Sequence, residues 1–393
     1  MKTVFKIICL WLFVLCSGSN LEAAPPSPEG KGSPPLSKNA DKNVQPPKGA
    51  LPSPKGKGSS PVSKSTDKNV QLPKAAPPKK KKPSEAIFVA KIRKDDPNGI
   101  VFVVRMPSGW TPEKDKEARE KGVKSVRGVL IICTWDKNPG ALVGNVSIQR
   151  SKFGSLVRFA DTNGLAVMTW SNFGGYQTKI SSDEMGRKAA RSSDAFFNER
   201  LAEWEYGIKR IVKRFNLPSD SYMGYGLSGG AQILHRMALR KPQYFSGIHV
   251  HVNSSYDIPT PKGKDVVWLV STGEFELGCP AATRFYQKMV KMGYCAIFKV
   301  GEQIGHSSSR EIDALSLEFF KYLLSFMPNS DNPEWTSPAP DKYHLIKDPP
   351  YIGDYLNQVS YPAKNAPGKI ADEECMVPLP TEKMARAWGP VIK

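Results

Sequence analysis

A serine between glycines is the first group in this chain that could carry out covalent chemistry. Residues 226–230 read Gly-Leu-Ser-Gly-Gly and fit the pattern G-x-S-x-G around Ser228. Residues 221–227 are typical of a strand, and residues 231–240 have a helical pattern. A sharp turn between a strand and a helix exposes a serine side chain, and glycines let the neighbouring backbone approach it. We therefore predict that Ser228 is a nucleophile; the alternative is an ordinary serine in a glycine-rich turn.

A nucleophilic serine needs a histidine to take its proton. His306 follows an apolar segment in the sequence Gly-His-Ser, so we expect it in a loop at the carboxyl end of a strand and predict it as the base. His235 falls on a predicted helix, and His344 lies beyond the predicted core domain. His249 and His251 alternate along a strand, as metal ligands can, but no third ligand stands at a suitable spacing. We interpret that pair as structural.

A carboxylate must orient the histidine. Glu274 and Glu276 both follow the predicted strand 266–272, and either could serve, because they share one side of an extended chain. Asp257 follows the preceding strand and is the outside candidate. The residues alone therefore leave the acid open.

The order of these groups resembles that of the α/β-hydrolase fold, in which the serine is followed along the chain by the acid and then by the histidine. Residues 272–276, Thr-Gly-Glu-Phe-Glu, resemble the family's usual His-Gly-x-x-Asp ending. The resemblance covers residues 86–327 and implies that Glu276 is the acid, with Glu in place of Asp. It extends to the polyester-depolymerase, feruloyl-esterase and prolyl-peptidase-like branches. We expect neither a cofactor nor a metal ion.

The resemblance also implies an oxyanion hole built from two backbone N–H groups. Gly229, directly after the nucleophile, would supply the first. The second would come from the loop after the apolar segment 128–134, where members of the family often have His-Gly. This chain has Thr-Trp-Asp at 134–136, and Trp135 is the donor that its position suggests.

Alternating strands and helices must position these groups, and they occupy a predicted domain at residues 85–328. Short apolar runs bounded by turn residues predict strands at 86–93, 100–106, 128–134, 165–170, 221–227, 245–252, 266–272 and 295–300. Amphipathic patterns predict helices at 151–161, 194–215, 231–240, 281–292 and 309–326. This alternation predicts an α/β fold with a doubly wound, mostly parallel sheet. In such sheets, function gathers in the loops beyond the carboxyl ends of the strands.

The first residues of the chain predict export. Lys2 and Lys6 precede a short apolar run and then small residues, so residues 1–23 have the pattern of a secretory signal peptide. A lipid anchor at Cys16 is a weaker alternative. We expect a secreted or periplasmic protein.

Residues 24–84 predict a disordered linker, because two copies of a 26-residue repeat rich in Pro, Lys, Gly and Ser contain almost no large apolar residues. Thirteen lysines against three acidic residues give this linker +10 of the formal net charge of +19. Such a segment could hold the protein near an anionic polymer or membrane surface, or serve as a spacer without a partner. Nucleic acid is not expected, since the linker lacks aromatic residues for base stacking.

The C-terminal residues and the cysteines yield further structural expectations. Residues 329–393 are rich in Pro, Trp and Tyr, which predicts an extended strap packed on the domain, ending in a helix at 381–388 capped by Thr381. Cys133 is expected to be a buried free thiol. Cys279 and Cys295 flank a predicted helix and are too far apart to bond, so any disulfide would join Cys375 to one of them.

Three functions fit these observations. The first is a secreted ester hydrolase that forms an acyl-enzyme on Ser228 and acts on an ester, with acylated polysaccharide as the first substrate to consider. The second is a secreted peptidase with the same catalytic groups. The third is a binding protein that keeps the fold without the activity. The presence of a serine, an acid and a histidine in the expected order argues against the third, and the ester hydrolase is the leading hypothesis.

Overall fold

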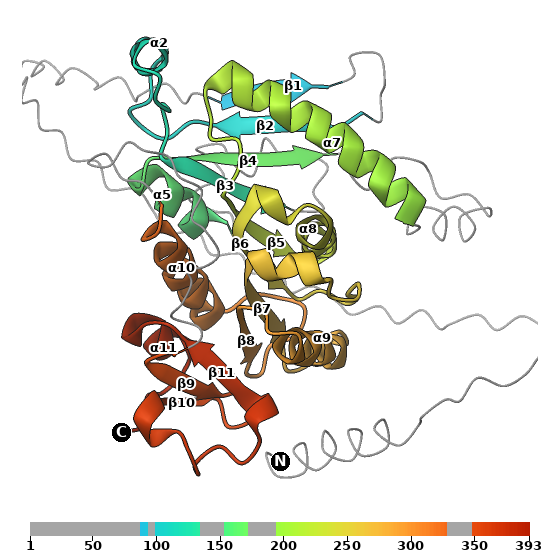
Figure 1. Cartoon of the computed structure of the whole chain (residues 1–393), viewed down its shortest axis with the longest axis vertical. Helices are drawn as coiled ribbons and strands as arrows, with labels where there is room; N and C mark the ends of the chain where they lie inside the picture. Colours follow the sequence, from blue (N-terminus) through green and yellow to red (C-terminus); the bar gives the residue numbers. More distant parts are fainter. Residues whose placement is uncertain (1–86, 93–98, 134–152, 172–193, 328–347) are drawn as a thin grey trace, which may run out of the picture. The chain divides into compact units, whose positions relative to one another are not determined.

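The computed structural model describes residues 87–92, 99–133, 153–171, 194–327 and 348–393 (Figure 1). The predicted signal peptide, the linker 24–84, Trp135 and His344 lie outside these residues, and those predictions stay untested. Within the described ranges, no helix combines the length and the apolar composition that a membrane crossing requires.

Within the described residues, the main sheet has eight strands in the order β1-β2-β4-β3-β5-β6-β7-β8 (Figure 1). Pairs β1–β2 and β2–β4 are antiparallel, and all other pairs are parallel. The parallel strands are mainly apolar and almost wholly buried, because helices cover both faces of the sheet. The predicted doubly wound fold of the α/β-hydrolase type is confirmed. The bounds of the strands are β1 (Ile87–Lys91), β2 (Val101–Arg105), β3 (Gly128–Cys133), β4 (Leu165–Ser171), β5 (Tyr222–Leu227), β6 (Phe245–His251), β7 (Val267–Gly273) and β8 (Ala296–Gly301).

The helices pack in two layers around this sheet. α5 and α10 lie together on one face, where Phe159 and Phe320 contact each other with ring centroids 6.3 Å apart, and α8 and α9 lie on the other (Figure 1). α7 packs over the antiparallel strands, with Trp204 against Trp170 of β4. The five predicted helices are present, with ends shifted by up to three residues. The bounds are α2 (Pro112–Glu120), α5 (Gly154–Thr162), α7 (Asp194–Phe215), α8 (Gly229–Arg240), η1 (Pro242–Tyr244), η2 (Pro261–Asp265), α9 (Cys279–Lys291) and α10 (Arg310–Leu324).

The C-terminal residues pack on β8 and contain more regular structure than their sequence indicates. They form a second, antiparallel sheet in the order β10-β9-β11, followed by the predicted helix, whose first N–H groups include one bonded to the Thr381 side chain. The indole N–H of Trp388 donates to the carbonyl of Phe298 in β8, 2.7 Å away. This unit thereby covers the edge strand of the main sheet. Its elements are β9 (Tyr351–Asp354), β10 (Val359–Pro362), η4 (Ala363–Asn365), η5 (Glu373–Cys375), β11 (Met376–Leu379) and α11 (Glu382–Trp388).

No disulfide joins the four cysteines of the described residues. Cys133 is buried in β3 as predicted, and burial raises the pKa of its thiol. The suggested bond from Cys375 to Cys279 or Cys295 is not formed. The Cys375 thiol instead pairs with the Tyr355 hydroxyl, and burial raises its pKa to about 11.

Candidate active site

Ser228 occupies the tight turn between β5 and α8. Its backbone is in a region that is unfavourable for residues other than glycine, with φ 55° and ψ −124°, a conformation that costs on the order of 1–3 kcal/mol. Hydrogen bonds on both sides hold it: the Ser228 N–H donates to the carbonyl of His251 at 3.0 Å, and the Ser228 carbonyl accepts from the Gln232 N–H at 3.0 Å. A Cβ atom on Gly226 would lie 2.7 Å from the Cα of Ala231, so this turn requires glycine at that position.

Ser228, His306 and Glu276 form one chain of hydrogen bonds. The Oγ of Ser228 lies 2.7 Å from Nε2 of His306, and Nδ1 of His306 lies 2.8 Å from Oε2 of Glu276. The Glu276 side chain is 7% exposed, whereas that of His306 is 54% exposed. The carboxylate is therefore shielded from water, while the histidine and the serine can be reached by a small molecule. The structure thus brings together the three residues that the sequence placed in different loops.

The loops that carry the acid and the histidine are bonded to each other through their backbones. The Phe275 N–H donates to the carbonyl of Ile304, and the Glu274 N–H donates to that of Gly301, both at 2.9 Å. A Cβ on Gly273 would overlap the carbonyl oxygens of Ile304 and Gly305, so glycine permits this close approach. The position of Glu276 relative to His306 follows from this pairing.

Glu274 points elsewhere. Its Oε2 accepts from the backbone N–H of Gln303 at 2.9 Å. The expectation that Glu274 and Glu276 share one side of an extended chain is wrong, because the Glu276 N–H donates to the Gly273 carbonyl at 3.1 Å and closes a turn. This turn directs the two carboxylates to different partners.

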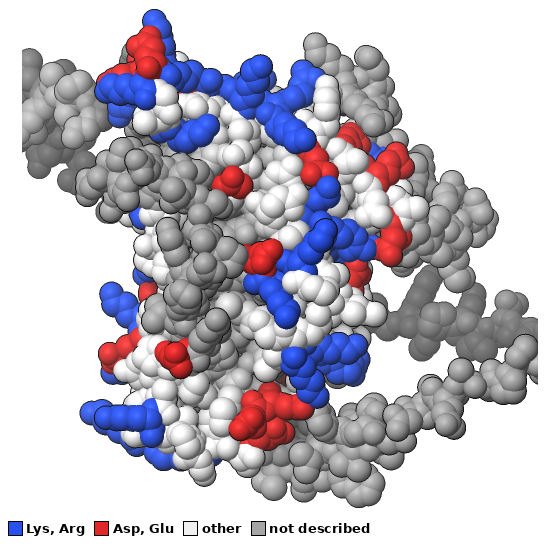
Figure 2. All heavy atoms as spheres, in the orientation of Figure 1, with Lys and Arg blue, Asp and Glu red and all other residues white. Residues whose placement is uncertain are grey.

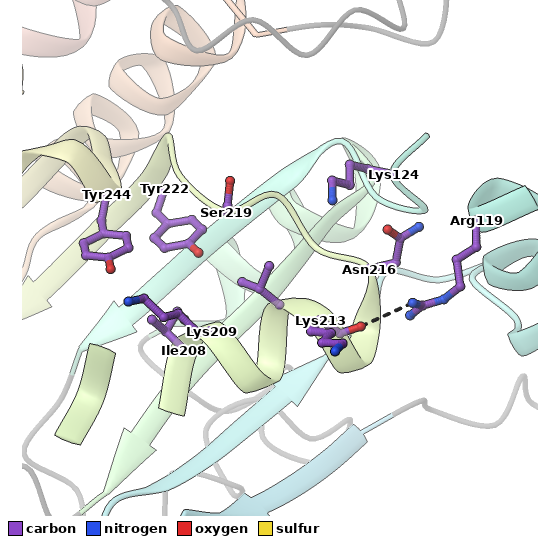
Figure 3. Close-up of a pocket in the computed structure, with 10 residues that line it drawn as sticks. Arg119, Lys124, Ile208, Lys209, Lys213, Asn216, Ser219, Tyr222 and Tyr244 are labelled. Carbon is purple, nitrogen blue, oxygen red and sulfur yellow. Dashed lines mark hydrogen bonds between the residues drawn. The ribbon is translucent and has the colours of Figure 1, made fainter. Parts of the chain in front are cut away.

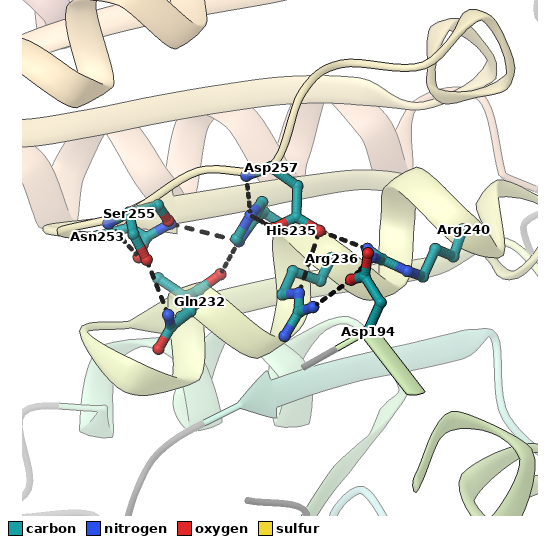
Figure 4. A network of polar contacts seen from close by, with 9 residues as sticks. Asp194, Gln232, His235, Arg236, Arg240, Asn253, Ser255 and Asp257 are labelled. Carbon is teal, nitrogen blue, oxygen red and sulfur yellow. Dashed lines mark hydrogen bonds and ion pairs between the residues drawn. The ribbon is translucent and has the colours of Figure 1, made fainter. Parts of the chain in front are cut away.

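Asp257, the outside candidate for the acid, belongs to a different network (Figure 4). Its Oδ2 accepts from Arg236 at 3.1 Å and from Arg240 at 2.6 Å, and both guanidinium groups also bind Asp194. Burial alone would raise the pKa of Asp257, but the hydrogen bond from Arg240 and the surrounding positive charges lower it. Asp257 therefore fastens the loop after β6 to α8 and to the start of α7.

Of the two predicted oxyanion donors, Gly229 and Trp135, the structure describes the first. Gly229 is the first residue of α8, so its N–H has no acceptor within the helix and remains available to a ligand. Trp135 lies outside the described residues. Its role stays a prediction.

The rings of His249 and His251 form hydrogen bonds with serine hydroxyls. Both rings contact the Oγ of Ser271, at 2.6 Å and 2.7 Å. Nδ1 of His249 also contacts the Oγ of Ser316 at 2.8 Å. Among the described residues, no group of three or more His, Cys, Asp or Glu side chains is arranged to hold a metal ion.

The buried His235 links folding to pH. Burial lowers its pKa from 6.5 to about 4, and its Nε2 accepts the Asp257 N–H at 3.0 Å, a bond that requires the neutral ring. Between pH 6.5 and about pH 4, His235 is protonated in the unfolded chain but not in the folded chain, so acid favours unfolding. We expect the free energy of unfolding, measured with urea, to fall by about 2 kcal/mol from pH 7 to pH 5 through His235 alone.

His249 acts in the same direction, because burial holds its pKa well below 6.5. The matched control for His235 is His235→Gln, in which the dependence on pH should be flatter than in the wild type. Equal slopes in the two proteins between pH 7 and pH 5 would contradict the assignment.

A pocket of about 340 Å³ lies away from Ser228 (Figure 3). It includes Tyr222 at the amino end of β5, whereas Ser228 follows the carboxyl end; the rise along a strand separates them by about 20 Å.

The lining of this pocket is basic and includes Arg119, Lys124, Lys209 and Lys213. Figure 2 shows Lys and Arg gathered over α2 and the neighbouring end of α7. The lysines are exposed and form no ion pair within the described part of the chain.

The chain matches no known family model, and no curated protein is detectably similar to it in sequence. Solved structures are similar at low identity. A ferulic acid esterase has 14% identity and a TM-score of 0.40, covering 61% of this chain and 97% of its own. A fungal esterase from Rhizomucor miehei has 9% identity and a TM-score of 0.43, covering 62% and 84%. The S-formylglutathione hydrolase of Staphylococcus aureus has 10% identity and a TM-score of 0.40, covering 61% and 98%.

Proposed function

We propose that this protein is a secreted serine hydrolase that cleaves carboxylic esters through a covalent acyl-enzyme on Ser228. The observation that carries the proposal is the hydrogen-bonded series Ser228, His306 and Glu276, with contacts of 2.7 Å and 2.8 Å. Export is inferred from the sequence of residues 1–23.

The contacts suit a two-step acyl transfer. With a proton on Nδ1, held by Glu276, the Nε2 of His306 takes the proton of the Ser228 hydroxyl while Oγ attacks the ester carbonyl. The same nitrogen then gives its proton to the departing alcohol, leaving the acyl group on Oγ. Water repeats the sequence, so the acid is released and Ser228 regains its proton. The Gly229 N–H, with Trp135 as the suggested second donor, would stabilise the negative charge on the carbonyl oxygen.

Exposed apolar side chains beside the acid favour an ester with an apolar or aromatic group. Phe275 is 60% exposed and Leu277 is 97% exposed, and they flank Glu276 in the chain. Exposed side chains of this size offer contact area to an apolar acyl group. A secreted peptidase with the same three residues is the second candidate, and a binding protein without turnover is the third.

Hydrolysis of short p-nitrophenyl esters, compared with that of aminoacyl p-nitroanilides, tests the proposal. We expect turnover of the esters and little or none of the anilides. Preferential cleavage of anilides would identify a peptidase instead. Absence of turnover on both substrates, together with absence of labelling by a fluorophosphonate, would favour the binding protein.

An acidic polysaccharide is the partner that we propose for the basic surface. Lys124, Lys209 and Lys213 lie around the pocket described above, and residues 24–84 add a net charge of +10. Carboxylates along a polymer could contact several of these lysines at once, which would keep the enzyme near acyl groups on the same chain.

Binding to an immobilised polyuronate measures this attraction. The double substitution Lys209→Ala with Lys213→Ala, and separately the removal of residues 24–84, should each weaken retention at low salt, and the difference should fade above about 0.15 M salt. Turnover of a soluble ester should not change. Lys364→Ala with Lys383→Ala is the matched control, because both lysines are exposed and line no part of this pocket. Equal retention of all variants, or binding to anionic vesicles alone, would contradict the proposal.

A further inference from the structure

A buried series of four polar side chains lies beneath the candidate site, between β6, β7 and α10. His251, Ser271, His249 and Ser316 are each at most 1% exposed. Ser271 joins the two histidines at 2.7 Å and 2.6 Å, and Ser316 contacts His249 at 2.8 Å. The reaction proposed above uses none of these side chains, and such groups are costly to bury unless they are bonded.

His251 is bonded to both loops that must meet at the site. Its carbonyl accepts the N–H of Ser228 at 3.0 Å, and its Nε2 lies 3.1 Å from the carbonyl of Ser307, the residue that follows His306. The hydrogen bond between the side chains of Ser228 and His306 depends on the relative position of these two backbones. One residue therefore connects the backbone of the nucleophile to that of the base.

The contact with Ser307 indicates which ring nitrogen of His251 carries the proton. A carbonyl only accepts, so the contact with Ser307 requires a proton on Nε2 of His251. In the neutral ring, Nδ1 must then accept from the hydroxyl of Ser271.

Ser271 donates its one proton to His251 and therefore accepts from Nε2 of His249. The hydroxyl of Ser316 donates to the carbonyl of Ile312 at 2.8 Å, so its single proton is not available to Nδ1 of His249, and the series beyond Ser271 does not decide the tautomer of His251. Burial keeps the pKa of His249 well below its usual value, so this ring stays neutral near pH 7. The hydroxyl of Ser271 thus supports the tautomer of His251 that can hold Ser307.

We propose that His251 is a positioning residue for the Ser228 and His306 pair, and that Ser271 acts by fixing its tautomer. The proposal rests on the function proposed above and goes beyond it, because it gives a role to a residue outside the series Ser228, His306 and Glu276. Its Nε2–H holds the backbone next to His306, which keeps the ring of His306 within hydrogen-bond reach of the serine.

Two substitutions of His251 separate positioning from packing. The amide nitrogen of glutamine can reach the place of Nε2 and donate to Ser307, whereas the shorter asparagine places its amide near Nδ1 and cannot. We expect His251→Asn to lower kcat for a p-nitrophenyl ester by about tenfold or more with KM within about twofold, since small misplacements of catalytic groups are costly. Labelling of Ser228 by a fluorophosphonate should slow by the same factor. His251→Gln should stay within about threefold of the wild type.

Ser271→Ala tests whether the tautomer of His251 matters and changes the core less. It replaces the His251→Asn experiment if that variant does not fold. It removes the hydroxyl that donates to Nδ1, so kcat should again fall while KM is kept. Equal losses in the asparagine and glutamine variants, or an unchanged kcat in Ser271→Ala, would overturn the proposal alone. A wild-type protein that neither hydrolyses esters nor reacts with the fluorophosphonate would overturn the proposed function, and this proposal with it.

Discussion

Replacing Ser228 with alanine is expected to lower kcat for a p-nitrophenyl ester by at least about 10⁴-fold. The Oγ atom is the group that lies 2.7 Å from Nε2 of His306, and without it no acyl-enzyme can form. The activity that remains should be the small part that the oxyanion donors and substrate binding supply by themselves. KM should change little, because alanine keeps the shape of the site.

Ser254→Ala is the matched control for this experiment. Ser254 is an exposed serine in the loop after β6, and its hydroxyl makes no contact with His306 in the structure. We expect its activity to equal that of the wild type. The thermal midpoints of both variants should stay near the wild-type value, since serine and alanine bear similar strain at a positive φ. Turnover by Ser228→Ala above about one per cent of the wild-type rate would contradict the assignment.

Replacing Glu276 with glutamine is expected to lower kcat by at least about 100-fold with little change in KM. The carboxylate accepts the Nδ1 proton of His306 at 2.8 Å and is almost fully buried. A glutamine amide can turn its NH₂ group toward the ring, which favours the tautomer with the proton on Nε2. That tautomer cannot accept the proton of Ser228.

Glu274→Gln is the control, because Glu274 lies two residues before Glu276 in the same turn but binds Gln303 and not His306. Glu274 accepts the N–H of Gln303, and its amide counterpart can do the same through oxygen. We expect a loss of less than about tenfold. A larger loss of kcat in Glu274→Gln than in Glu276→Gln would make Glu274 the acid. The turn that the Glu276 N–H closes on the Gly273 carbonyl would then not be the conformation of the active enzyme.

The parts of the fold that the sequence could predict are those governed by local pattern. Strands β3, β5 and β7 are buried on both faces, and their mainly apolar sequences indicate this directly. The turn at Ser228 was also predictable from local sequence. In a sharp turn from strand to helix, Ala231 approaches residue 226 so closely that this residue must be glycine. The order of serine, acid and histidine then pointed to the three loops whose side chains are hydrogen-bonded in the structure.

The parts that could not be predicted depend on contacts between distant residues. Glu274 and Glu276 differ through one backbone bond to Gly273, and alternation along the chain does not reveal a turn. The small C-terminal sheet is stabilised by contacts such as that of Trp388 with Phe298, ninety residues away. The connection of His251 to Ser307 likewise joins positions that no local pattern relates.

The most direct test of the central claim is to treat the wild-type protein with a fluorophosphonate and locate the adduct by mass spectrometry of its peptides. An activated serine is phosphonylated far faster than an ordinary one, because a neighbouring histidine takes its proton. We predict a single adduct, on Ser228, that is absent from Ser228→Ala and forms much more slowly in Glu276→Gln. An adduct on another residue, or one that persists in Ser228→Ala, would contradict the account.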